Sequence, residues 1–149
     1  MSVIFSGDEH ADSMAGTDWD LGGGAYSDPT VDDEFYWAAA ELYITTGDVA
    51  YSRDLANNSY SSANVTTLFS IPGGFSWGAV AALGQLDLAS VSSNVTNHQA
   101  IVQSIVDAAD MYLAVQRNVS NGFGTLLTTY PWGSNSNQLN NIQVSPTST

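Results

Sequence analysis

Cysteine is absent from the chain, so the protein can form neither a disulfide bond nor a thiolate metal site. Basic residues are nearly absent as well. Arg53 and Arg117 stand against 15 acidic residues, which gives a formal net charge of -13. Nucleic acid and anionic membrane surfaces both bind basic patches, so this charge argues against either partner. No apolar run approaches the length that a membrane span requires.

The residues that are present can still build a core. Apolar residues make up 44 % of the 149 residues, which suits one domain or part of one. Charged residues make up only 11 %, so Ser, Thr, Asn and Gln must supply most of the polar surface. This composition is compatible with a soluble, secreted protein and with a neutral polysaccharide as substrate.

The first part of the chain, residues 1–24, is predicted to be an acidic, glycine-rich loop. His10 lies among acidic residues there, a pattern that would also suit a metal site. We favour a solvated acidic loop over a metal site. The segment 1–5 is too short to be the apolar part of a signal peptide.

The strongest helix pattern follows, from residue 30 to residue 46. Thr30 and Asp33 have the spacing of a capping box, and three acidic residues suit the positive end of the helix dipole: Asp32, Asp33 and Glu34. Gly47 is the expected left-handed stop. Because the helix is apolar nearly all round, we expect it to be buried on more than one side.

Three further helices are predicted, and a fifth is predicted to begin near residue 139. They cover residues 48–55 with Asp48 as cap, residues 77–91 with Ser76 as N-cap, and residues 96–116 with an apolar face. Residues 57–62 are predicted to be a polar connector. Gly78 and Gly84 lower helix propensity, and would be tolerable where two helices approach closely. With no alternation of strands and helices, the fold class is all-α.

Three blocks of sequence resemble glycoside hydrolase family 9, the inverting β-1,4-glucanases, in the family's order. They are residues 33–48 (Asp33-Glu34-Phe35-Tyr36-Trp37 onwards), residues 75–84 (Phe75-Ser76-Trp77-Gly78 onwards) and residues 130–141 (Tyr130-Pro131-Trp132-Gly133-Ser134-Asn135 onwards). The resemblance implies that residues 25–144 form the central part of the family's catalytic domain, within an (α/α)6 barrel. Residues 145–149 are then a polar tail.

The catalytic segments of that family are not found in this sequence. Members take their base from an Asp-Ala-Gly-Asp segment and their acid from a late Glu, and they bind substrate with a His-x-Arg segment. The chain has no such base segment, neither His10 nor His98 precedes an arginine by two residues, and the three glutamates do not match the terminal acid: Glu9, Glu34 and Glu41. The acidic cluster at residues 32–34 is a poor substitute, because three acids in one helical turn point in different directions. We therefore predict no catalytic residue within the chain.

The resemblance also implies a calcium site. Asp33 and Glu34 match a ligand pair of the family, and Asp28, Thr30 and Asp32 can supply further oxygen ligands. Gly78 stands where the family has an aspartate. Simple capping of the helix by these acids is the alternative interpretation.

Two aromatic residues are the candidates for sugar contact. Trp132 matches a cleft aromatic of the family, and Tyr26 lies where other members have cleft aromatics. Aromatic faces stack on sugar rings. Core packing is the alternative for both residues, and the expected role of Trp37 and Trp77.

Together these observations predict a fragment of a secreted β-1,4-glucanase of the inverting type, inactive as this isolated chain. Its expected partners are cellulose or another β-glucan and the remainder of the catalytic domain. Four sequons fit a secreted eukaryotic protein: Asn57, Asn64, Asn94 and Asn118. A non-catalytic carbohydrate-binding protein and a purely structural helical domain are the alternatives.

Overall fold

The structure is a computed structural model that describes residues 30–63, 68, 75–76, 78–91, 94–118, 127, 130 and 133–144. The chain divides into two units, residues 1–31 and 32–149, and the helices all belong to the second. They are α1 (Asp32–Thr46), α2 (Val49–Asn57), the short 3-10 helix η3 (Ser59–Ser62), α4 (Ala81–Ser90), α5 (His98–Asn118) and α6 (Ser134–Ile142). Across the described ranges there is no strand, only one isolated bridge between Ser76 and Ala79. The prediction of an all-α protein is confirmed.

The turn between α1 and α2 forms as predicted. Gly47 adopts a φ of 68°, which favours glycine, and its N–H donates to the Tyr43 carbonyl at 2.8 Å. Asp48 then caps α2, because its Oδ1 accepts a hydrogen bond from the Ala50 N–H at 2.9 Å. This two-residue connection makes α1 and α2 a helical hairpin, the unit from which an (α/α)6 barrel is built.

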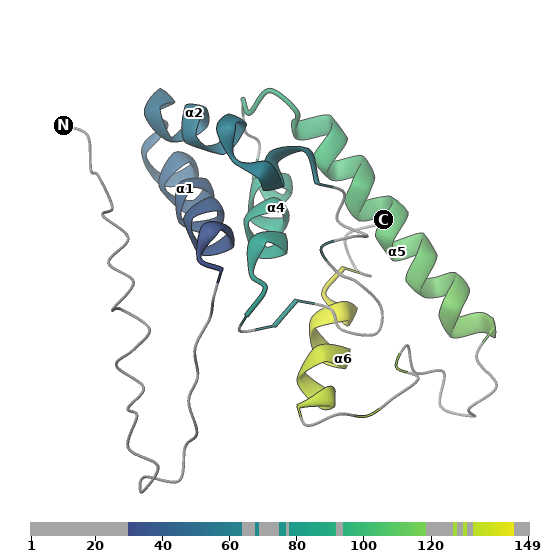
Figure 1. Ribbon diagram of the computed structural model, residues 1–149. Helices are drawn as coiled ribbons and strands as arrows, with labels where there is room; N and C mark the ends of the chain where they lie inside the picture. Colours follow the sequence, from purple (N-terminus) through teal and green to yellow (C-terminus); the bar gives the residue numbers. More distant parts are fainter. Residues whose placement is uncertain are drawn as a thin grey trace, which may run out of the picture. The chain divides into compact units, whose positions relative to one another are not determined.

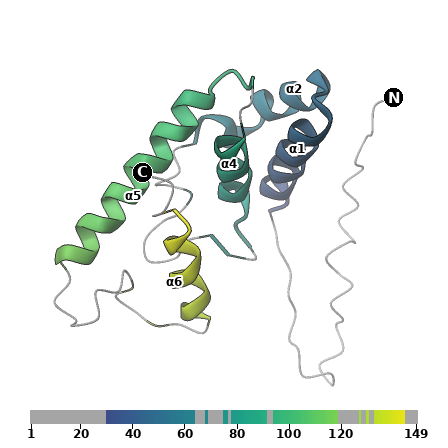
Figure 2. The same cartoon turned by 180° about the vertical axis from the view of Figure 1, so that it is seen from behind.

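Helices α1 and α4 pack closely side by side (Figures 1 and 2). A Cβ atom added at Gly84 would lie 3.1 Å from the Cα of Trp37 and 3.1 Å from the ring of Tyr36. The prediction that Gly84 marks a close helix approach is therefore confirmed. Tyr36 is almost fully buried at this contact, and burial raises the pKa of its hydroxyl to about 12, against the opposing effect of a hydrogen bond with Gln85.

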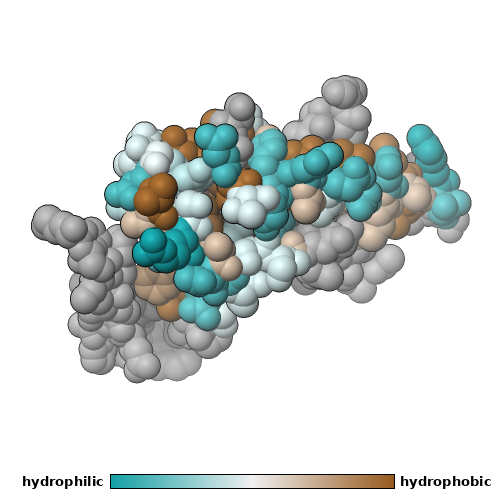
Figure 3. Space-filling view, turned by 90° about the horizontal axis from the view of Figure 1, so that it is seen from above, coloured by the Kyte–Doolittle hydropathy of each residue, from teal (hydrophilic) through white to brown (hydrophobic). Residues whose placement is uncertain are grey.

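The second face of α4 packs against α5. The predicted apolar face of α5 is buried at five positions: Ile101, Ile105, Ala108, Ala109 and Tyr112. Burial holds the pKa of the Tyr112 hydroxyl above its ordinary value. Seen from above, the described surface is mostly polar, with apolar side chains showing between the polar ones (Figure 3).

The predicted start of α4 is wrong. The helix begins at Ala81 rather than at residue 77, and Ser76 is not its N-cap. Instead Ser76 and Ala79 exchange two backbone hydrogen bonds of 3.2 and 3.0 Å, which close a turn before the helix. Gly78 is exposed in that turn, outside any helix. Because the backbone groups of Ser76 and Ala79 bond to each other, these residues do not join the hydrogen-bond pattern of α4.

Two other boundaries differ from the prediction. The expected polar connector at residues 57–62 contains η3, which begins after Asn58 because the Asn58 side chain accepts from the Tyr60 N–H at 2.9 Å. Buried Gln85 then fixes η3 against α4 by donating to the carbonyls of Tyr60 and Ala63. Helix α6 begins at Ser134, earlier than predicted, directly after Gly133 with its φ of 79°. The predicted loop 1–24 and the tail 145–149 lie outside the described residues.

Helices α1, α4 and α6 run in the same direction. In Figure 1 the N-terminal ends of α1 and α4 lie at the lower end of that pair, and α6 lies below them with its own N-terminal end farthest away. Each of the three helices overlaps one of the three blocks that resemble family 9. The bonds from Val80 to Asp33 and from Asn140 to Phe75 join the three blocks at the turn before α4.

Candidate functional site

Asp33 is the most buried acidic side chain near this turn, with 3 % of its surface exposed. Its Oδ2 accepts a hydrogen bond of 2.8 Å from the N–H of Val80, the residue that precedes α4. Val80 has no side-chain cap of its own. The Asp33 carboxylate thus caps the N-terminus of α4, where the helix dipole favours negative charge.

The acidic residue of the predicted capping box, Asp33, bonds outside its own helix. The helix begins at Asp32, two residues after Thr30, and the Asp33 carboxylate is directed to α4. An acidic side chain at this position of a capping box normally reaches back within its own helix. Here the Asp33 carboxylate instead joins α1 to Val80, which directly precedes α4 and lies 47 residues later in the sequence.

The second oxygen of Asp33, Oδ1, is buried and has no hydrogen-bond partner among the described residues. A buried polar atom left unpaired costs about 1–3 kcal/mol. A hard cation or an ordered water molecule would remove that cost, so this oxygen fits the first ligand of the predicted calcium site.

The other predicted metal ligands are placed differently. Asp32 is exposed, and Glu34 is half-buried in the same turn of α1. Thr30 is exposed in the first unit, and Asp28 lies outside the described residues. Within the described ranges no three His, Asp or Glu side chains are grouped so that they can hold a metal ion. Further ligands would therefore have to include backbone oxygens, water, or residues beyond those ranges.

The turn at residues 75–80 is held at both of its ends. At one end, Asp33 accepts the Val80 N–H; at the other, the Nδ2 of Asn140 donates to the Phe75 carbonyl at 2.7 Å. Phe75 is buried in the core, so this carbonyl is fixed close to the interior. Sequence reasoning missed Asn140, because nothing distinguishes it from the other amides of its Asn-rich segment.

The predicted sugar-contacting residues, Trp132 and Tyr26, lie outside the described residues, as does Trp77. The described neighbour of Trp132 is Gly133, whose left-handed backbone begins α6 and whose carbonyl accepts from the Ser136 hydroxyl at 2.7 Å. Trp37, expected in the core, is half-buried and uses its indole N–H in a hydrogen bond.

That hydrogen bond leads to a second acidic pair. The Nε1 of Trp37 donates to Oδ2 of Asp87 on α4 at 2.9 Å, and Asp87 is also hydrogen-bonded to Glu41 of α1. Burial raises the pKa of Asp87, and the hydrogen bond and the charge of Glu41 raise it further, against the opposing Trp37 bond. Two carboxyl groups in direct contact leave no room for the water that an inverting pair holds across about 6.5–9.5 Å. Glu41 and Asp87 are therefore a structural pair between α1 and α4.

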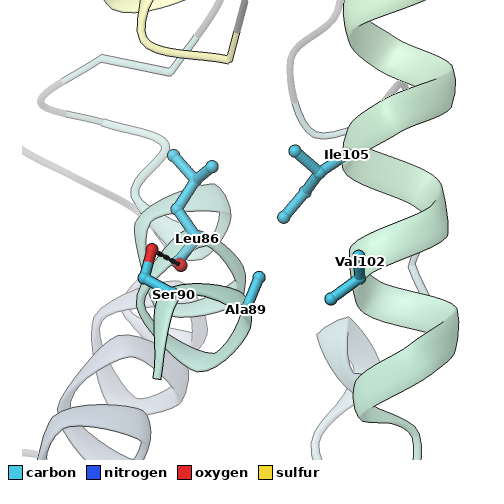
Figure 4. Close-up of a pocket in the computed structure, with 5 residues that line it drawn as sticks. All are labelled: Leu86, Ala89, Ser90, Val102 and Ile105. Carbon is cyan, nitrogen blue, oxygen red and sulfur yellow. Dashed lines mark hydrogen bonds between the residues drawn. The ribbon is translucent and has the colours of Figure 1, made fainter. Parts of the chain in front are cut away.

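A hollow of about 230 Å³ lies between α4 and α5 (Figure 4), lined by Leu86, Ala89, Ser90, Val102 and Ile105. The Ser90 hydroxyl bonds to the Leu86 carbonyl of its own helix at 2.7 Å. The lining is otherwise apolar, so the hollow offers few groups that would orient a sugar. Among the described helices, none combines the length and apolar character needed to cross a bilayer.

Residues 6–146 match glycosyl hydrolase family 9. The chain is 45 % identical over 139 residues to endoglucanase C of Cellulomonas fimi, covering 91 % of this chain and 12 % of that protein. It is 34 % identical over 142 residues to a cellulose 1,4-beta-cellobiosidase of Acetivibrio thermocellus, with 83 % of this chain and 16 % of that protein covered. It is 36 % identical over 117 residues to endoglucanase D of the same organism, with 75 % and 17 % covered. The chain thus spans less than a fifth of each relative's length, and it belongs to glycosyl hydrolase family 9.

Proposed function

We propose that these residues form the central part of a catalytic domain that cleaves β-1,4-linked glucan with inversion. One observation supports the proposal: the three blocks that resemble the family meet at the turn before α4, where Asp33 accepts from the Val80 N–H and Asn140 donates to the Phe75 carbonyl. Segments that are distant in sequence and meet at one end of a helical framework are well placed to form one wall of a binding cleft.

The contribution of this wall is binding rather than bond cleavage. Inversion needs one carboxylic acid and one carboxylate base. Asp33 accepts a hydrogen bond from the Val80 N–H, and Asp87 is hydrogen-bonded to Glu41. Neither carboxyl group is therefore placed to act as the catalytic acid or base. The reacting pair would come from outside residues 1–149, while Trp132 and Tyr26 would stack on sugar rings.

A calcium ion at Asp33 and Glu34 is the proposed structural cofactor. The unpaired Oδ1 of Asp33 supports it, since a cation would satisfy that buried oxygen. Binding to the folded state alone at 100 times the dissociation constant would raise stability by about 2.7 kcal/mol. Unchanged melting when calcium is added to metal-stripped protein would contradict this part of the proposal.

The protein is proposed to act outside the cell, on cellulose or a related glucan, with the remainder of the catalytic domain as partner. A non-catalytic carbohydrate-binding protein is the second candidate. It is favoured by the absence from this sequence of the family's acid, base and His-x-Arg segments.

Hydrolysis and binding assays on the purified chain test the proposal. We expect no sustained release of reducing ends from a soluble β-glucan over hours, but measurable binding of cellohexaose that Trp132→Ala weakens. Loss of about 3–5 kcal/mol of stability in Trp132→Ala, with unchanged binding per folded molecule, would place Trp132 in the core instead. Sustained hydrolysis abolished by Asp33→Asn with folding intact would show that the chemistry lies in this chain after all.

A further inference from the structure

A shallow groove runs between η3 and the first turns of α5. It consists of two adjoining hollows of about 350 and 540 Å³, which share Asn97 and Ala100 in their linings. Both volumes lie within the range of small-molecule binding sites, about 300–1,000 Å³. None of the described residues that line the groove carries a charge, although the chain has 15 acidic residues. The groove is therefore an uncharged region of a strongly acidic protein.

The lining of this groove combines small apolar side chains with hydroxyl and amide groups. The apolar part consists of Ala63, Ala100 and Ile101, and the polar part consists of Ser61, Ser62, Thr96, Asn97, Gln99, Gln103 and Ser104. A sugar ring has the same two kinds of surface, with C–H groups on its faces and hydroxyl groups around its edge. Hydroxyl and amide side chains both donate and accept hydrogen bonds, as sugar hydroxyl groups do. The lining therefore fits a neutral ligand rich in hydroxyl groups better than it fits an ion.

The wall of the groove that η3 provides is fixed from two sides. The Nδ2 of Asn97, just before α5, donates to the Ser61 carbonyl at 2.7 Å. The Nε2 of Gln85 on α4 donates to the carbonyls of Tyr60 and Ala63 at 3.0 and 2.9 Å. Because side-chain amides from two neighbouring segments already hold this backbone, a ligand would have little of the wall to order on binding.

The groove lies away from the turn at residues 75–80. That turn precedes the N-terminal end of α4, whereas α5 begins after the C-terminal end of α4. In Figure 1 the turn is at the lower end of α4, and α5 begins at the upper end. A ligand in the groove would therefore occupy a different place from one in the proposed cleft.

We propose that this groove is a second, non-catalytic binding site for a β-1,4-glucan chain. It holds a part of the polysaccharide that is not being cleaved, and so keeps the protein on its substrate. The ligand class follows from the lining, and the inference rests on the proposed function only for the identity of the sugar. No aromatic side chain is among the described lining residues, so the groove lacks a stacking platform and binds weakly, with a dissociation constant of about 1 mM.

Two matched pairs of variants on α5 test the groove. Ala100→Leu places a larger side chain in both hollows, and Ala114→Leu makes the same change at an exposed position outside them. Gln99→Ala removes an amide from the groove, and Gln116→Ala removes one from an exposed position outside it. Leucine and alanine are both good helix formers, so all four variants are expected to fold.

Backbone amide chemical shifts, recorded by nuclear magnetic resonance on the full chain during titration with cellohexaose, measure binding at the groove itself. In the unmodified chain the amides of Ser61 and Asn97 should shift together and saturate. Ala100→Leu should weaken this binding by about tenfold or more, because the leucine fills space that the sugar needs. Gln99→Ala should weaken it by about three- to tenfold, the equivalent of one lost hydrogen bond. Both controls should stay within about twofold of the unmodified chain.

The same titration of Trp132→Ala separates the groove from the cleft, and the groove shifts should remain. Their loss in this variant would assign them to the cleft and overturn the inference. Absence of shifts at Ser61 and Asn97, or equal affinities of Ala100→Leu and Ala114→Leu, would also overturn it and leave the proposed function standing. Groove shifts in a chain whose cellohexaose binding is otherwise independent of Trp132 would support the inference and contradict the proposed role of Trp132.

Discussion

The α1–α4 pair and α6 are held in the molecule in different ways. Between α1 and α4, Gly84 permits close backbone contact, and hydrogen bonds cross the interface from Val80 to Asp33, from Trp37 to Asp87 and between Asp87 and Glu41. The pair therefore has its main contacts within the described residues.

Helix α6 shows the opposite distribution of polar and apolar groups. Leu139 and Ile142 are 64 % and 48 % exposed, whereas Asn141 is fully buried and both atoms of its amide are without a partner in the described ranges. This pattern suits a helix whose neighbours belong to another part of a larger domain. The contrast teaches that the α1–α4 interface is complete within the described residues, whereas α6 has few of its contacts there.

The largest expected difference comes from shortening one leucine in each region. Leu88 of α4 is fully buried, so Leu88→Ala should cost about 2–5 kcal/mol of unfolding free energy through lost burial and a cavity. Leu139→Ala, the matched change on α6, should stay within about 0.5 kcal/mol. Denaturant unfolding of both variants measures the two values, and equal losses would mean that α6 is as firmly packed as α4.

A smaller effect is expected at the acidic start of α1. Asp33→Ala leaves the buried Val80 N–H without its acceptor and should cost about 1–3 kcal/mol. Asp32→Ala removes the same charge from an exposed neighbour and should change stability by no more than about 0.5 kcal/mol. If thermal melting shows the two variants to be alike, the bond between Asp33 and α4 contributes little to the interface.

The smallest effect concerns pH and the Glu41–Asp87 pair. Because the pKa of Asp87 is raised in the folded protein, the folded state holds this proton more tightly than the unfolded chain does. Stability should therefore be greatest below the unfolded pKa of an aspartate, decrease as pH rises towards the folded pKa, and then level off.

Asp87→Asn should remove this part of the pH dependence and leave the protein slightly more stable at neutral pH, by less than about 1 kcal/mol. Asp54→Asn, at an exposed site on α2, controls for the loss of one negative charge. Melting curves recorded between acidic and neutral pH would contradict the interpretation if the Asp87→Asn variant kept the full pH slope of the unmodified protein.

Local features of the fold were predictable from the sequence, and contacts between distant segments were not. Gly47, Asp48 and the apolar face of α5 act through neighbours within a few residues, so their patterns determined the structure. The start of α4 was missed because it depends on Asp33, which lies 47 residues away and was assigned to its own helix. The interpretation of Gly84 was correct, because a glycine inside a helix is tolerated best where a neighbouring helix leaves little room for a side chain.

The candidate site shows the same difference between local features and contacts between distant segments. Resemblance located the three blocks, and the fold joins them at the turn before α4. The bonds that organise this turn, from Asn140 to Phe75 and from Val80 to Asp33, have no periodic pattern in the sequence and needed the three-dimensional structure. The roles proposed for Trp132 and Tyr26 remain predictions.

The bond between Asp33 and Val80 has a consequence for the order of folding. Helix α4 has only 10 residues, and an isolated helix shorter than about 12–15 residues is marginal in water. It has no N-terminal side-chain cap of its own and obtains one from a carboxylate on α1. A peptide of residues 75–91 should therefore show little helical circular dichroism. In the whole chain, α4 should become a stable helix only when it packs against α1, so that the two helices form in a single cooperative step.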